Sequence, residues 1–296
     1  MRETIEYNFS KFEEAVNSLC RYLNLEEEIV LQYLNSETRE FSADIFLRTL
    51  DIPEENLLEY DLLLTALHVT TSNDECSSIQ RYGLLNLQNA IRLDTTLGRY
   101  IREHGVDIDF VEKNIRYDNR VYNIGLESFR RSSVDSEEET ALYDVIEKLY
   151  TDYQINAFFS HDNALQYAGS VSSRPEFLED LSYLLDNRGI ERDWRYNRSN
   201  SCFVIKFVER PSAFSDDTFE LEAEEVQRLS EGELEIKRRK WIIEKTLEVI
   251  YMYTNHRILP ENIAYLRFGI EIQPSNIREI HTRDEYLENY VTVRDC

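Results

Sequence analysis

The sequence is poor in the residues that interrupt regular structure and in those that build disulfide or metal frameworks. Its 296 residues include five prolines, eight glycines and four cysteines, and so few Pro and Gly residues argue against long flexible linkers. The cysteines form no Cys-x-x-Cys pair and lie near no cluster of histidines: Cys20, Cys76, Cys202 and Cys296. Free thiols in a reducing cytoplasm, without a metal site, are therefore expected.

Several other signals of common protein classes are missing. No run of about 18 apolar residues occurs, so no membrane-spanning helix is expected. The charged start, MRETIEYNFSKFEEAV, lacks the apolar centre of a signal peptide. The glycines are isolated and form neither GxGxxG nor GxxxxGK[ST], and no GxSxG is present. These absences leave no support for dinucleotide-binding Rossmann loops, P-loops or the nucleophile elbow of hydrolases.

Acidic residues are in large excess. The chain has 57 Asp and Glu against 33 Lys and Arg, a formal net charge of −24, yet it is 42% hydrophobic and 12% aromatic. That hydrophobic content predicts a folded protein rather than a disordered one. A negative field repels phosphate backbones, so direct binding to nucleic acid is not expected, whereas a basic protein partner would be attracted.

Helical periodicity dominates the first 60 residues and then gives way to a different pattern. Apolar residues recur every three or four positions, at Phe12, Val16, Leu19 and Leu23. The segment LLLTALHVTT, at 62–71, is short, apolar and ends in β-branched residues, which predicts a buried strand. DECSSIQRYGLL follows, and its pattern predicts a short helix that Gly83 ends.

The remaining segments alternate in the same way between helix and strand. We expect one helix over 86–105, an acidic-started helix over 135–155, a strand over 201–210 buried mainly on one face, a long helix over 219–254 broken at Gly232, and a last strand over 263–272 before a turn at Pro274. The expected fold class is therefore α+β. Its two parts would be a helical N-terminal region at 1–60 and a mixed core of short strands interrupted by helices at 61–296.

His68 and Thr70 are the first candidate site residues. Two residues apart on a strand, they face the same way, and their side chains can hydrogen-bond a ribose and an amide. This stretch resembles the start of the ADP-ribosyltransferase fold, the family of NAD-dependent transferases and toxins. In that family a His-x-Thr element precedes a helix with an Ile…Gly-Leu ending; the matching residues are His68, Thr70, Ile79, Gly83 and Leu84.

The resemblance implies specific roles. His68 would bind the nicotinamide ribose of NAD, Thr70 would lie beside it, and Gly83 would shape the rim. The alternative is a core histidine bonded to a backbone carbonyl, in a strand followed by an ordinary helix.

Two later stretches extend the resemblance. NAFFSHDNALQYAG is similar to the family's second motif, which offers Ser160 and Tyr167 as further NAD-binding residues, with the tyrosine stacking on nicotinamide. AYLRFGIEIQPSNIREI is similar to the late strand that carries the catalytic glutamate. The family places that glutamate early on the strand, where this chain has Tyr265, while Glu261 precedes the strand and Glu271 comes late in it. Glu271 is the candidate catalytic residue.

Two functions remain open at this point. One is an NAD-consuming ADP-ribosyltransferase-like protein that modifies a protein or nucleic acid, or hydrolyses NAD, in phage–host or toxin-type conflict. The other is a non-enzymatic acidic protein that oligomerises around a basic partner, such as a defence nuclease, and blocks its nucleic-acid site. Acidic residues gather at 26–29, 135–139 and 216–235. The basic stretch EIKRRKW, at 235–241, is expected to form ion pairs along a helix.

Overall fold

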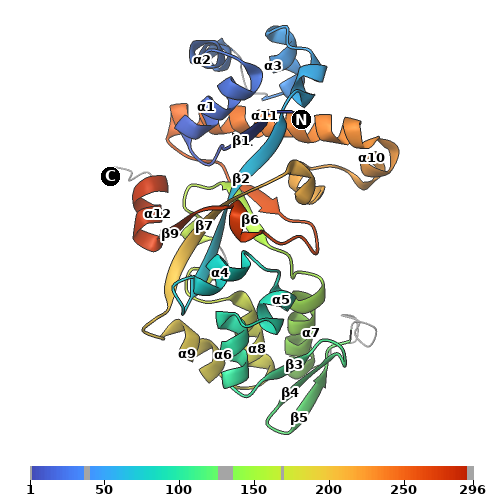
Figure 1. Cartoon of the computed structure of the whole chain (residues 1–296), viewed down its shortest axis with the longest axis vertical. Helices are drawn as coiled ribbons and strands as arrows, with labels where there is room; N and C mark the ends of the chain where they lie inside the picture. Colours follow the sequence, from blue (N-terminus) through green and yellow to red (C-terminus); the bar gives the residue numbers. More distant parts are fainter. Residues whose placement is uncertain (1, 37–40, 126–135, 168–169, 292–296) are drawn as a thin grey trace.

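A six-stranded sheet lies at the middle of the molecule, with helices gathered above and below it in the view of Figure 1. The computed structural model describes residues 2–36, 41–125, 136–167 and 170–291. The strand order is β8-β6-β2-β7-β9, with β1 beside the first part of β2. The strands are β1 (Thr4–Tyr7), β2 (Asp61–Ser72), β6 (Asn156–Ser160), β7 (Ser201–Glu209), β8 (Asn262–Tyr265) and β9 (Ile277–Thr282). The protein is thus a mixed helix-and-strand fold, whose sheet is antiparallel except where β1 meets β2.

The pair β2–β7 forms the centre of the sheet. Its register runs unbroken from Leu64 opposite Glu209 to Ser72 opposite Ser201. The strand predicted at 62–71 is confirmed as β2. The prediction that the strand at 201–210 is buried mainly on one face is wrong, because Val204 and Ile205, which point to opposite faces, are both fully buried. Helix α12 (Arg283–Tyr290) covers the second face, where Tyr286 joins the same apolar cluster as Val204.

Helices from the N-terminal region and from residues 223–256 pack on the upper part of the sheet (Figure 1). They are α1 (Phe12–Leu23), α2 (Glu27–Ser36), α3 (Ala43–Thr49), η1 (Glu54–Leu58), α10 (Ala223–Arg228) and α11 (Glu231–His256). The first 60 residues are mainly helical, as expected, but they also contribute β1 to the core sheet. The predicted break at Gly232 is misplaced: Ser230 caps α11 with Glu233 in a capping box, so Gly232 lies inside the first turn.

A second group of elements forms the lower lobe and has its own apolar core, in which Val145, Leu178 and Trp194 are fully buried. It contains α5 (Leu87–Arg92), α6 (Thr96–Glu103), β3 (Asp107–Asp109), β4 (Asn114–Tyr117), β5 (Arg120–Asn123), α7 (Glu137–Tyr150), α8 (Glu176–Leu184) and α9 (Gly189–Arg195). The short helix α4 (Ser77–Tyr82) leads into this lobe, but its Ile79 packs on the core of the sheet. The single helix predicted over 86–105 is two helices. The second helix, α6, begins after Thr95, whose side chain caps it by accepting a hydrogen bond from the Gly98 amide.

The last predicted strand, over 263–272, is also shorter than expected. β8 ends at Tyr265, and the chain then turns through Gly269, whose φ is +79°. It returns to form an isolated bridge between Ile272 and Leu84. Short helices complete the chain: η4 (Ala164–Gln166), η6 (Pro211–Ala213), η7 (Asp217–Phe219) and η8 (Pro274–Asn276).

Candidate functional site

A cavity of about 550 Å³ lies against β2 between the sheet and the lower lobe. We call it the β2 cavity. Three of the residues predicted to bind NAD line it: His68 and Thr70 from β2, and Tyr167 from the end of η4. Its other polar walls come from Thr71, Lys148, Asp152, Gln154, Asn156, Arg174, Glu176 and Tyr265. This volume is in the range that holds a drug-sized ligand.

The cavity exists because β2 and β6 separate. Their register pairs Leu67 with Phe158, and β2 then continues to Ser72 with β7 on its other edge. From His68 onward the β6-side edge of β2 faces the cavity, with residues 68–71 lining it. Backbone amides and carbonyls along such an edge are able to hydrogen-bond a ligand.

The geometry of His68 fixes its hydrogen-bonding roles. Nδ1 lies 2.7 Å from the backbone oxygen of Asn156. A carbonyl only accepts, so Nδ1 carries the hydrogen and Nε2 is left as an acceptor in the neutral ring. Burial lowers the pKa of His68, and the hydrogen bond to Asn156 only partly opposes this effect. The imidazole is therefore neutral at pH 7. The alternative, a histidine hydrogen-bonded to a backbone carbonyl, therefore holds for Nδ1. The ring of His68 nevertheless lines the cavity.

Charged groups from α7 and α8 form one wall of the cavity. Lys148 Nζ donates to Asp152 at 2.5 Å and to Glu176 at 2.6 Å. Burial lowers the pKa of Lys148, but these two carboxylates raise it overall. One turn after Glu176, Asp180 lies partly buried beside the same group, and burial raises its pKa to about 7 against the attraction of Lys148. The lining itself therefore carries two cations, Lys148 and Arg174, and two carboxylates, Asp152 and Glu176.

Replacing Asp180 with asparagine is expected to stabilise the protein at alkaline pH. A carboxyl whose pKa is raised to about 7 weakens the folded state as pH rises from about 4 through 7. After allowance for solvent screening, we expect a gain of about 1–2 kcal/mol at pH 8 and about half of that at pH 5.5. Thermal unfolding at both pH values measures it. The exposed Asp186→Asn is the control, and an equal gain at the two pH values would contradict the titration.

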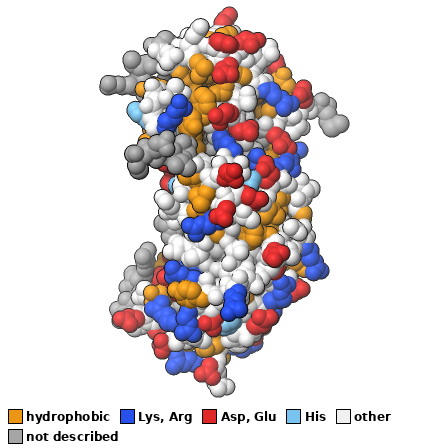
Figure 2. Space-filling model, turned by 90° about the vertical axis from the view of Figure 1, so that its left-hand side faces the viewer, with side chains coloured by type: hydrophobic (Ala, Val, Ile, Leu, Met, Phe, Trp, Pro, Cys, Tyr) orange, Lys and Arg blue, Asp and Glu red, His pale blue; other side chains and the backbone are white. Residues whose placement is uncertain are grey.

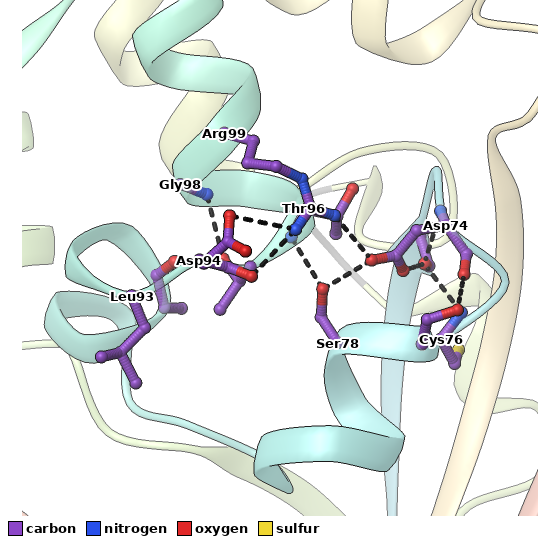
Figure 3. Close-up of polar contacts among 12 residues, drawn as sticks. Asp74, Cys76, Ser78, Leu93, Asp94, Thr96, Gly98 and Arg99 are labelled. Carbon is purple, nitrogen blue, oxygen red and sulfur yellow. Dashed lines mark hydrogen bonds and ion pairs between the residues drawn. The ribbon is translucent and has the colours of Figure 1, made fainter.

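The loop after β2 is braced by a polar network around Asp74 (Figure 3). Asp74 accepts from Ser72 Oγ at 2.7 Å, from Ser78 Oγ at 2.5 Å and from Arg99 Nη2 at 3.1 Å. Ser78 in turn accepts from the Thr96 amide at 2.9 Å. Burial raises the pKa of Asp74, but the two serines and Arg99 lower it overall. The network ties 72–78 to 94–99, and the segment between them supplies cavity residues.

Replacing Asp74 with alanine is expected to destabilise the protein by about 1.5–2 kcal/mol, because Ser78 and Arg99 lose a charged acceptor in a partly buried place. The lowered pKa means that this stabilisation is present at neutral pH and is lost in strong acid. Urea unfolding at pH 7 measures the loss. Asp94→Ala is the control, since Asp94 is 62% exposed in its pair with Arg99 and should cost under about 0.5 kcal/mol.

The other predicted site residues lie outside the cavity. Gly83 has a φ of +82°, and a Cβ there would come within 1.8 Å of the Ile272 oxygen, so it is needed for close backbone packing. Ser160 is fully buried, donates to the Pro260 carbonyl at 2.8 Å and accepts from Asn262. Neither residue lines the β2 cavity.

Glu271 is also misplaced by the sequence prediction. Its Oε1 accepts from the Asn86 amide at 3.2 Å and from Asn89 Nδ2 at 2.8 Å, at the start of α5. It follows the end of β8 rather than lying on the strand, and it is not among the residues that line the cavity. The expected late strand ends too early to carry it toward His68, so the only carboxylates on the described lining are Asp152 and Glu176.

Sequence reasoning missed the cavity residues of the lower lobe. Lys148, Arg174 and Glu176 come from segments whose periodicity indicates only helices, and Gln154 precedes β6 without any local motif. Arg174 is 4% exposed and donates to Glu191 at 2.7 Å. The burial of Arg174 depends on tertiary contacts, so the sequence pattern does not predict it.

Much of the acidic excess has partners within the chain. Five of the nine acidic residues of 216–235 form ion pairs with its own Lys or Arg side chains: Asp216, Glu220, Glu225, Glu231 and Glu235. The ion pairs expected along the helix of EIKRRKW are confirmed for Arg238 and Arg239, whereas Lys237 and Lys240 pair with carboxylates of other elements. These pairs leave fewer carboxylates of 216–235 available to a basic partner.

Comparisons with known proteins add no relatives: no family model, no curated protein and no solved structure matches the chain. Among the described residues, no helix has the length and apolar composition needed to cross a bilayer. The same residues contain no cluster of His, Cys, Asp and Glu placed to hold a metal ion. Cys20, Cys76 and Cys202 are free, and Cys296 lies outside the described residues.

Proposed function

We propose that the β2 cavity binds the nicotinamide-ribose half of NAD, and that the protein is ADP-ribosyltransferase-like. The observation that carries this proposal is the convergence of His68, Thr70 and Tyr167 on one cavity, although Tyr167 is nearly 100 residues away in sequence. The resemblance of 66–85 to the family's first motif rests on the sequence alone and the cavity rests on the structure, so the two lines of support are independent.

The residues divide into distinct roles in binding. His68 Nε2 accepts from a ribose hydroxyl, because Nδ1 is held by Asn156. Tyr167 stacks its ring on the nicotinamide. Its side chain is 37% exposed, and its ring centroid lies 5.0 Å from that of Phe158 in an edge-to-face arrangement. The free edge of β2 and the amide of Gln154 present donors and acceptors to the carboxamide.

Transfer of ADP-ribose would need a carboxylate near the ribose carbon, to stabilise the positive charge that develops there. Glu176 is our candidate, because it lines the cavity and its side chain is 42% exposed. Lys148 holds Glu176 and Asp152 at once. Glu176 must therefore exchange part of its contact with Lys148 for the ligand before it can act, which makes NAD binding the more direct consequence of the geometry.

The test is NAD binding followed by turnover. Calorimetric titration with NAD, and thermal unfolding in 1 mM NAD, ADP-ribose or nicotinamide, should show binding and a raised melting temperature. Release of nicotinamide is then followed with and without Glu176→Gln. Lack of any NAD binding at millimolar ligand would end the proposal. Binding without nicotinamide release would retain the pocket and remove the transferase activity.

A further inference from the structure

Four arginines lie together on the surface of α9 and the turn that follows it. Arg188, Arg192 and Arg195 are spaced by four and three residues, so they project from one side of the helix. Arg198 follows in the turn, and all four side chains are exposed. The opposite side of α9 is anchored in the lower lobe by Trp194, which is fully buried.

The carboxylates of this segment pair with only one of these four arginines. Residues 188–198 contain two acidic side chains, Glu191 and Asp193. Glu191 accepts from the buried Arg174 at 2.7 Å, and Asp193 pairs with Arg192 at 3.3 Å. Across the described part of the chain, no ion pair forms with the other three arginines of the cluster, Arg188, Arg195 and Arg198.

Two exposed tyrosines accompany the arginines. Tyr183, on α8, is 51% exposed, and the guanidinium carbon of Arg188 lies 3.4 Å from its ring centroid. Tyr196, just after α9, is 73% exposed, and Arg195 lies 5.8 Å from its ring centroid. We call the surface formed by these residues the α9 surface; its members are Tyr183, Arg188, Arg192, Arg195, Tyr196 and Arg198. It combines three arginines that have no ion pair among the described residues, and one that pairs with Asp193, with flat aromatic groups.

The α9 surface stands out from the rest of a strongly acidic molecule. Figure 2 views the side of the molecule on which α9 lies, and Lys and Arg side chains gather over the lower lobe there, next to apolar ones. By contrast, the cations of EIKRRKW are all paired within the chain. Charges separated by more than about 10 Å are largely screened at 0.1 M salt, so a local cluster acts despite the net charge of −24.

We propose that the α9 surface binds single-stranded nucleic acid. Its arginines meet backbone phosphates, and Tyr183 and Tyr196 stack with unpaired bases, which a duplex does not expose. The arrangement of cations beside exposed rings is the one that such strands require. The expectation that the chain avoids nucleic acid followed from its total charge and took no account of where the arginines gather.

The α9 surface also adjoins the β2 cavity. Asn200 Nδ2, in the turn after α9, donates to the Ser173 carbonyl at 2.9 Å, next to the cavity residue Arg174. On the inner side, Trp194 Nε1 donates to Thr71 Oγ1 at 3.0 Å, and Thr71 lines the cavity. A strand held on α9 would therefore lie close to the cavity. The binding itself does not depend on NAD and is tested without it.

The experiment is fluorescence anisotropy with a labelled 20-nucleotide DNA strand, the matching RNA strand and the DNA duplex, over a range of salt. The triple variant Arg192→Ala, Arg195→Ala, Arg198→Ala should bind either single strand at least tenfold more weakly than the wild type. The slope of log affinity against log salt should be shallower by about 2 in this variant, because each of the three lost phosphate contacts contributes about 0.7 to the slope. Tyr196→Ala should weaken single-strand binding about tenfold with an unchanged slope.

The matched control is the triple variant Arg210→Ala, Arg228→Ala, Arg283→Ala, which removes the same charge from exposed positions elsewhere. It should bind within about twofold of the wild type. The proposal is overturned if no strand binds at 100 µM protein, if the duplex binds as tightly as the single strands, or if polyglutamate competes as well as the oligonucleotide. Equal losses in the two triple variants would also overturn it, because the effect would then come from net charge alone.

Discussion

Replacing His68 with alanine should weaken NAD binding about 30- to 100-fold, which corresponds to roughly 2–3 kcal/mol. In the proposed complex the side chain supplies an acceptor for the ribose, and in the structure it donates to the Asn156 carbonyl. Its loss would leave a ribose hydroxyl of the bound ligand without this hydrogen-bond acceptor. Calorimetric titration of both proteins with NAD measures the change, and circular dichroism establishes that the variant is folded.

The two ring nitrogens can be tested separately. His68→Asn retains a donor near the position of Nδ1 and removes the acceptor at Nε2, so the fold should be kept and NAD affinity lost. His68→Gln places an amide oxygen nearer to Nε2 and should recover part of the affinity. If the asparagine variant binds NAD like the wild type, His68 does not contact the ribose.

The pH dependence of NAD binding adds a further test. Under the proposed function the neutral form of His68 binds the ribose, and burial lowers the pKa of His68. Affinity should therefore stay constant from pH 8 down past the ordinary value of 6.5, and fall only at lower pH. A fall centred at or above 6.5 would point to another titrating group.

The first half of the site could be predicted because its signals are local. A run of apolar and β-branched residues marks β2, and the alternation of side chains places His68 and Thr70 on one face. The helix that follows ends at Gly83, where a positive φ and contact with the Ile272 backbone both require glycine. All of these residues lie within about 20 positions of one another, a range over which the pattern of apolar residues indicates the secondary structure.

The second half of the site depends on contacts that no local pattern encodes. Lys148 and Glu176 reach the cavity because α7 and α8 pack into a separate lobe core, which then closes against the sheet. The apolar pattern of 263–272 predicts a continuous strand that carries Glu271. Gly269 and the bridge from Ile272 to Leu84 turn that segment toward α5 instead.

Short polar strands were missed for a related reason. β1, with residues TIEY, is recognisable only by its parallel pairing with β2. The strands β3, β4 and β5 have three or four residues each and carry mostly polar side chains. Segments of that length fall below what hydrophobic periodicity can distinguish from a loop. The net charge likewise does not predict where charged side chains lie, so it gives no indication of the arginine cluster at α9.

Replacing Arg239 with methionine is expected to destabilise the protein by about 3–4 kcal/mol, the largest stability effect we predict. Arg239 is 4% exposed on α11 and donates to the carbonyls of Leu57 and Tyr60 and, through Nε at 2.8 Å, to Glu235. Methionine keeps the bulk but removes the donor to the partly buried Tyr60 carbonyl, and it leaves the Leu57 carbonyl with the Tyr22 hydroxyl alone. Urea unfolding should show the loss, with a melting temperature lower by about 6–10 °C.

The neighbouring Lys240 provides the control for this prediction. It lies on the same helix and also joins α11 to the N-terminal segments, through Asp44 at 2.6 Å and Glu54 at 2.7 Å, but both carboxylates are more than half exposed. Lys240→Met should cost under about 1 kcal/mol, because exposed ion pairs gain little over hydration. Tyr60 directly precedes β2, so loss of the Arg239 contact should also loosen the strand that carries His68 and weaken NAD binding. Equal destabilisation by the two variants would mean that charge on α11, rather than buried hydrogen bonding, holds the N-terminal helices to the sheet.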